Sequence, residues 1–111
     1  MSAPRLTTSL EASAWLARAT TAGGFGAVLH KGDAERGALL LLILERGEER
    51  FLVERLLQGN GGYGWERRPV VDSAATKQHL ARAVAMDRDM WILELNVPSA
   101  ERFIVEMTSP T

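Results

Sequence analysis

The stretch Gly37 to Leu57, GALLLLILERGEERFLVERLL, decides the fold of this chain. Residues 38–44 form an unbroken apolar run, which a charged segment with a glycine, Arg46 to Glu49, follows. Apolar character then returns at Phe51 to Val53. Two short apolar runs that flank a glycine turn are typical of a β-hairpin. We therefore expect this hairpin to form the centre of a sheet, with the rest of the chain covering it.

Patterns on either side of the hairpin predict the other elements. Thr8-Ser9-Leu10-Glu11 matches the S/T-x-x-E capping box, and apolar residues then recur at helical spacing up to Gly23-Gly24. This predicts a helix from 9 to 22. A second helix is predicted from Ala74 to about Met86, capped by Asp72 or Ser73. Further strands are predicted at 25–30, 65–68, 90–95 and 103–107.

The resulting order, α-β-β-β-(β)-α-β-β, predicts an α+β fold with a mostly antiparallel sheet of five to six strands and two helices. Residues 1–111 are expected to form a single domain with an ordered core from about 8 to 107. The central run is apolar on both faces, and such a strand needs cover on both faces. Two helices cover about one face. We therefore expect either the segment 58–72 or a second copy of the protein, in a homodimer through the sheet, to cover the other.

Composition excludes several classes of protein. A net charge of −1 gives no overall attraction to nucleic acid or to an anionic membrane. The absence of cysteine excludes disulfides, thiolate metal sites and cysteine nucleophiles, and it fits a reducing compartment. No apolar run approaches the roughly 20 residues that cross a bilayer, and the first residues lack the apolar core of a secretory signal. We expect a cytoplasmic protein without membrane association.

The first candidate binding cluster follows a glycine-rich loop and consists of Tyr63, Trp65, Arg67 and Arg68. Aromatic stacking beside arginine is how proteins hold single-stranded nucleic acid. The alternative is one aromatic packed inward and two solvated arginines on an edge strand. On such a strand Trp65 and Arg67 share one face and Arg68 lies on the other.

The second candidate cluster, Asp87 and Asp89, flanks Arg88 just before a predicted strand. Paired carboxylates can hold Mg²⁺ or transfer protons. The alternative is that they cap the end of the second helix and its loop, with Arg88 neutralising one of them.

No catalytic residue, metal site or cofactor is predicted. Gly59, Gly61 and Gly64 spell G-x-G-x-x-G, but the residues that follow, Trp65 to Pro69, cannot open the helix that a dinucleotide site needs. A flexible hairpin loop is the better interpretation. His30 and His79 have no partner at metal-ligand spacing, and no G-x-S-x-G motif occurs.

Several segments resemble one known family. Leu80-Ala81-Arg82 and the stretch Asp87 to Leu95, DRDMWILEL, look like the signature of the alphaproteobacterial domain-of-unknown-function family 1491. The segment Leu10 to Arg18 is similar to the N-terminal helix of that family, and Gly26 to Asp33 resembles its next passage. Arg88 departs from the family pattern, where proline is usual. The resemblance implies a small cytoplasmic protein with no assigned activity.

Three functions of different classes follow. The one we favour is a non-catalytic interaction or binding protein that forms a homodimer, since histidine clusters and nucleophile motifs are absent. An alternative is a Mg²⁺-dependent nuclease-like enzyme, because the element order matches the restriction-endonuclease-like core and Asp33 and Glu54 could supply carboxylates. No lysine follows Glu54 at the required place. Another alternative is a single-stranded nucleic-acid-binding module that uses Trp65 and Arg67.

Overall fold

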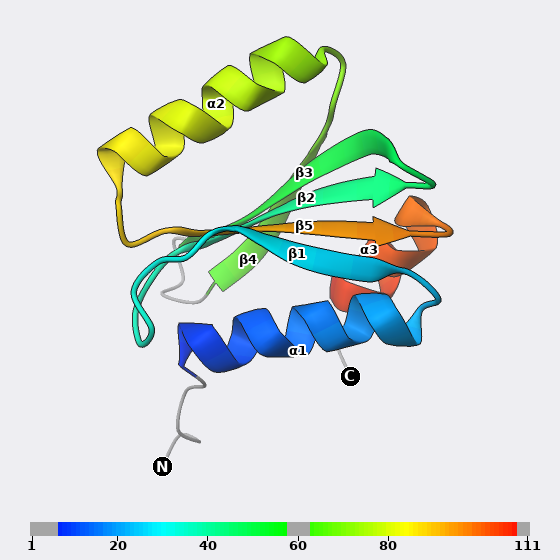
Figure 1. Ribbon diagram of the computed structural model, residues 1–111, viewed down its shortest axis with the longest axis horizontal. Coiled ribbons are helices and arrows are strands. Elements are labelled where there is room, and N and C mark those ends of the chain that lie inside the picture. The colour runs from blue at the N-terminus through cyan, green and yellow to red at the C-terminus, as the bar shows by residue number, and fades with distance from the viewer. Residues whose placement is uncertain (1–6, 58–62, 109–111) are drawn as a thin grey trace.

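The computed structural model describes residues 7–57 and 63–108. Its five strands form one sheet in the order β1-β5-β2-β3-β4, with helices on both faces (Figure 1). The elements follow the chain in the order α1 (Thr8–Thr21), β1 (Phe25–His30), β2 (Leu39–Glu45), β3 (Glu48–Leu57), β4 (Tyr63–Pro69), α2 (Ser73–Met86), β5 (Trp91–Val97) and α3 (Ala100–Thr108). The predicted α+β class is confirmed. No helix in these two described ranges is long and apolar enough to cross a membrane.

The predicted hairpin lies at the centre of the sheet, because β2 is the third of the five strands. β2 and β3 are antiparallel and are joined at Arg46 and Gly47, whose φ angles of 50° and 88° are those of a tight hairpin turn. The β1–β5 and β3–β4 pairs are also antiparallel. β5 runs parallel to β2, because the chain crosses over through α2 before it enters the sheet between β1 and β2.

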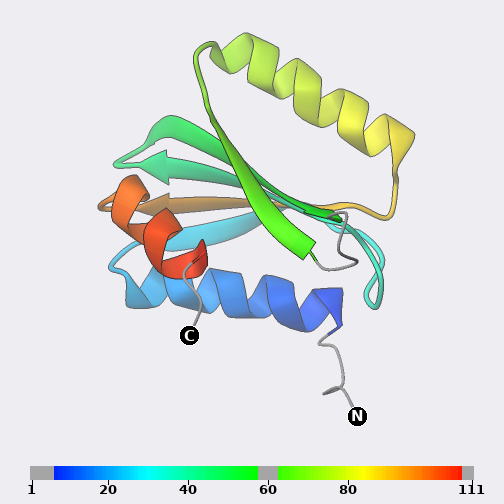
Figure 2. The same cartoon turned by 180° about the vertical axis from the view of Figure 1, so that it is seen from behind.

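Alternate side chains of β2 supply two hydrophobic layers. Leu39, Leu41 and Ile43 pack with residues of α1 and α3, whereas Leu40, Leu42 and Leu44 pack on the other face with Leu80 and Val84 of α2. Figures 1 and 2 show this arrangement, with α1 and α3 on one side of the sheet and α2 on the other. The expectation that both predicted helices share a face was therefore wrong. Because α2 covers the second face, the doubly apolar strand no longer requires a second copy.

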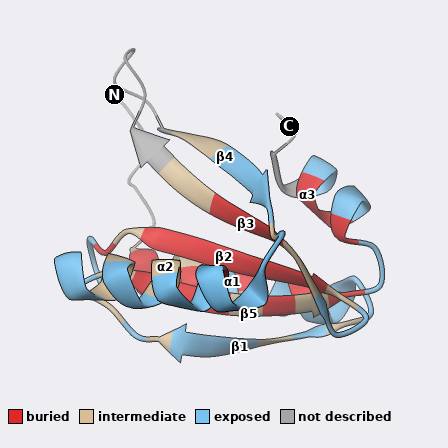
Figure 3. Ribbon diagram, turned by 90° about the horizontal axis from the view of Figure 1, so that it is seen from above, coloured by how far each residue is buried: buried red, intermediate tan, exposed pale blue. Residues whose placement is uncertain are grey.

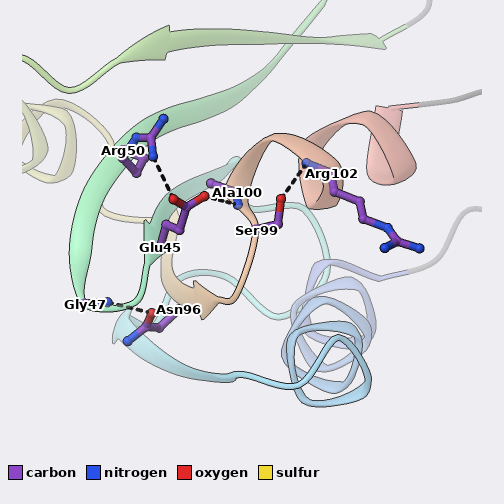
Figure 4. A network of polar contacts seen from close by, with 7 residues as sticks. All are labelled: Glu45, Gly47, Arg50, Asn96, Ser99, Ala100 and Arg102. Atoms are coloured by element: carbon purple, nitrogen blue, oxygen red, sulfur yellow. Dashed lines mark hydrogen bonds and ion pairs between the residues drawn. The ribbon is translucent and has the colours of Figure 1, made fainter.

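The segment Phe103 to Met107, predicted as the last strand, belongs to the helix α3. Ala100, Phe103 and Ile104 are buried at i, i+3 and i+4, which is helical spacing. A distant carboxylate holds the start of this helix: Glu45 Oε1 accepts a hydrogen bond from the Ala100 amide at 2.9 Å (Figure 4). Arg50 binds the other oxygen of Glu45, also at 2.9 Å. The β-branched and aromatic composition of the segment predicts a strand, but its contacts with the rest of the protein make it helical.

The start of α1 is shifted by one residue from the predicted capping box. Thr7, not Thr8, is the N-cap, and its Oγ1 accepts a hydrogen bond from the Leu10 amide at 3.3 Å. Thr8 is buried, and its hydroxyl donates to the Gly37 carbonyl at 2.9 Å. The helix thus begins by bonding to the loop before β2. It ends at Thr21, and Gly23, just after the C-cap Ala22, has the φ of 95° that the predicted glycine cap requires.

Candidate interaction surface

β4 carries most of the first predicted cluster and lies at one edge of the sheet, paired with β3 alone. Trp65 is partly buried against the α1 side of the core, where its ring meets that of Trp15 edge to face with centroids 5.7 Å apart. Arg67 shares this face, as predicted, and its Nη1 donates to Glu101 Oε2 of α3 at 2.8 Å. The stacking surface expected for nucleic acid is therefore occupied by contacts within the protein.

Of the remaining members of that cluster, Arg68 lies apart from Trp65. Arg68 lies on the α2 side of the sheet, and its Nη2 donates to Nε2 of His79 at 3.3 Å. Tyr63 is the first residue of β4, opposite Leu57. Residues 58–62, which include Gly59 and Gly61, are outside the described residues. Arg68 thus lies on the opposite face of the sheet from Trp65 and Arg67 and cannot share one binding strip with them.

Asp87 and Asp89 lie in the loop between α2 and β5. Asp87 is the C-cap of α2, and its Oδ1 accepts a hydrogen bond from the Asp89 amide at 3.0 Å. The Asp89 carbonyl accepts from the Asp33 amide at 2.9 Å, so this loop is joined to the segment before β2. The carboxylate of Asp87 forms the turn itself, as an Asx side chain commonly does.

The residues of the nuclease alternative also have structural roles. Asp33 Oδ2 accepts hydrogen bonds from the amides of Glu35 and Arg36, at 3.2 Å and 2.7 Å. Glu54 lies on β3 opposite Glu66. Across residues 7–57 and 63–108, no group of three or more His, Cys, Asp or Glu side chains could hold a metal ion. The geometry does not favour this alternative.

β1 forms the opposite edge of the sheet, and no described strand pairs with its outer side. Its sequence, FGAVLH, contains no Lys, Arg, Asp or Glu. Three of its large apolar side chains are exposed: Phe25 by 62%, Leu29 by 48% and Val28 by 43%. Figure 3 shows the contrast between the exposed β1 and the buried centre of the sheet. An open, apolar edge strand is a template for pairing with another strand.

Helix α1 extends this uncharged surface below the edge. Its Leu16 packs so closely on β1 that a Cβ at Gly26 would lie 2.7 Å from Leu16 Cδ2. Ser9, Ser13 and Thr20 lie at i−7, i−3 and i+4 from Leu16 and share its stripe of the helix. The charged residues Glu11 and Arg18 lie on other sides. We call Phe25, Val28 and Leu29 together with this stripe the β1 surface. Val28 pairs with Leu93 and shares the α1 face of the sheet, whereas Phe25, opposite Asn96, lies on the α2 face, so the surface runs around the edge.

Sequence reasoning did not single out the residues of the β1 surface. One signal was available, since Phe25 to His30 is a strand-like segment without a charged residue or a proline. Edge strands normally carry such protective residues. Recognising the segment as an edge also required the strand order, which only the long-range pairing with β5 determines.

The comparisons with known proteins agree on one family. A family model described as "Protein of unknown function (DUF1491)" matches residues 6–105. A DUF1491 family protein from Caulobacter crescentus CB15 has a crystal structure that is 29% identical in sequence, with a TM-score of 0.77 over 89% of this chain and 94% of that one. Its NMR structure gives the same identity and TM-score over 91% and 94%. A protein from A. tumefaciens, solved in solution, shares the fold at 24% identity, with a TM-score of 0.76 over 97% and 99%. No curated protein matches.

Proposed function

This chain belongs to the DUF1491 family of proteins of unknown function, and we propose that it is a non-catalytic interaction protein that forms a homodimer through the β1 surface. The observation that carries the proposal is the open edge of β1, with its exposed Phe25, Val28 and Leu29. Free amide and carbonyl groups of an edge strand bind a further strand through main-chain hydrogen bonds.

A second copy of the chain suits this edge for a geometric reason. Antiparallel pairing of one strand with its own copy has two-fold symmetry, which is the commonest symmetry of homo-oligomers. The Phe25 to His30 strand brings no like charges together, because it has no Lys, Arg, Asp or Glu. The neighbouring stripe of α1 is also uncharged. A strand of this length contributes a small interface by itself, so contact between the two α1 stripes adds to the buried area.

The homodimer expected from the sequence joined two copies through the sheet, whereas the proposed homodimer joins them through the β1 edge. The second face of β2 is covered by α2, so a dimer is no longer needed to bury it. The edge of β1 has no such cover among the described residues. A cytoplasmic location is part of the same proposal, supported by the cysteine-free composition.

The test is light scattering on the purified protein over a dilution series of about 1 to 500 µM, a range that includes weak dimers. We expect the mass to rise from one protomer to two. Leu29→Lys places a charge on both copies at the pairing edge, and we expect it to raise the dimer Kd by about tenfold or more.

Leu10→Lys is the matched control. Leu10 is 57% exposed on the side of α1 opposite to Ala12 and Ala19, so the same substitution there should leave the dimer Kd unchanged. A monomer at every concentration, or a Leu29→Lys protein that dimerises as well as the natural chain, would refute the proposal.

A further inference from the structure

A cleft of about 500 Å³ lies between the C-terminal end of α1 and the first turns of α3. The views in Figures 1 and 2 agree that these two helix segments lie side by side on the same face of the sheet. The rings of Trp15 and Phe103 meet there with centroids 6.4 Å apart. The volume falls within the roughly 300–1,000 Å³ that is typical of small-molecule sites.

The floor of the cleft is apolar and the rim is polar. Trp15, Val97 and Phe103 form the floor, and each belongs to the main hydrophobic core. Thr21 and Ser99 also line the cleft. A flat or branched apolar body fits a floor of this kind, and a few polar groups at the rim can orient it.

The rim carries more positive than negative charge. Arg102 and Glu106 of α3 both line it and form an ion pair, with 3.2 Å between Arg102 Nε and Glu106 Oε1. Arg18 lines the opposite wall, and within residues 7–57 and 63–108 no carboxylate lies at ion-pair distance from it. The nearby Glu11 is paired with Arg55 instead. The cleft therefore holds one guanidinium that no carboxylate of the described chain neutralises.

Arg18 also contacts an aromatic ring of the cleft. Its guanidinium carbon lies 4.9 Å from the centroid of the Trp15 ring, in a cation–π contact between residues one helical turn apart. A guanidinium presents paired N–H donors, which match the two oxygens of a carboxylate. The stacked ring restrains the side chain before a ligand arrives, and this lowers the entropic cost of binding.

We propose that this cleft binds a small monocarboxylate with an aromatic or branched apolar body. The apolar part lies against Val97 and Phe103, beside the Trp15 ring that Arg18 covers, and the carboxylate accepts hydrogen bonds from Arg18. This site is separate from the β1 surface, so the two proposals stand or fall independently.

Phenylacetate is the probe, with neutral phenylacetamide as its uncharged counterpart. When phenylacetate is added to ¹⁵N-labelled protein, the NMR signals of the Trp15 indole N–H and of the amides of Ser99 to Phe103 should shift. We expect a Kd on the order of 1 mM, as befits a ligand of this size. Phenylacetamide should bind at least about fivefold more weakly, because it cannot form the charge-assisted bonds.

Arg18→Gln should weaken phenylacetate binding by about fivefold or more and remove the preference over phenylacetamide. Arg18→Lys keeps the charge without the paired donors and should give an intermediate affinity. Two control variants should bind phenylacetate as the natural chain does. They are Arg36→Gln, in the exposed turn that Asp33 caps, and Leu29→Lys, on the β1 surface. The proposal is refuted if about 20 mM phenylacetate leaves the Trp15 signal in place, if phenylacetamide binds equally well, or if Arg18→Gln retains full affinity.

Discussion

The two edges of the sheet, β1 and β4, are built from opposite kinds of residue. β4 carries Glu66, Arg67 and Arg68 and ends at Pro69, whereas β1 carries no charged residue and no proline. Charges and proline are two of the means by which edge strands avoid unwanted pairing; a β-bulge is another, and β1 has a register shift of this kind between Val28 and His30. β4 is also bonded to both neighbouring layers, through Arg67 to α3 and through Arg68 to α2. This difference between the two edges is the basis of the proposal that β1, and not β4, pairs with a partner.

Removing the aromatic ring of β4 should have the largest effect on the free energy of unfolding. Trp65 of β4 packs on Trp15, so Trp65→Ala removes a partly buried ring and should lower the free energy of unfolding by about 2.5 kcal/mol. Urea denaturation measures this loss. The dimer Kd, extrapolated to fully folded protein, should not change. A destabilisation below about 1 kcal/mol would mean that β4 is no better anchored than β1.

Phe25→Ala makes the reciprocal change on β1. Because Phe25 is 62% exposed in the protomer, unfolding measured on dilute protein should change by less than about 0.5 kcal/mol. The dimer Kd, measured by light scattering, should rise about tenfold, which corresponds to about 1.4 kcal/mol. If stability falls as far as in Trp65→Ala while the dimer persists, the contrast between the edges is wrong.

The ion pair between Arg67 and Glu101 gives the smallest effect. Its side chains are 44% and 54% exposed, and exposed pairs of this kind contribute about 0.5 kcal/mol. A double-mutant cycle with Arg67→Ala and Glu101→Ala, followed by urea denaturation, should give a coupling energy of that size and a smaller one in high salt. A coupling of zero would leave Trp65 as the main anchor of β4.

The residues that could be predicted are those whose neighbours in sequence decide their structure. Leu39 to Leu44 is apolar on both faces, so its central place in the sheet could be read directly, and the spacing of Ala12, Trp15 and Ala19 identified α1. α3 could not be read in this way. Its residues Phe103 to Val105 favour a strand locally, and the hydrogen bond that holds the helix start comes from Glu45, 55 residues earlier.

The same limit applied to the candidate site. The face that Trp65 and Arg67 share was predictable from the alternation of a strand. The partners of these residues on α1 and α3 were not, because they depend on how the layers pack. The β1 surface could not be predicted because a strand is identified as an edge only from the order of all the strands, and that order depends on β5.

The position of β5 also governs how the chain can fold. β1 and β2 follow each other in sequence, but the sheet joins them only through β5, which pairs with both. As the polypeptide leaves the ribosome, the β2–β3–β4 meander can assemble early from local contacts, while α1 and β1 have no strand to join until residues 91–97 have been synthesised. Pairing across such long sequence separations is entropically costly and slow. Until that moment the nascent chain keeps both its N-terminal strand and the apolar flank of β2 exposed, and in this interval it is most dependent on protection from aggregation.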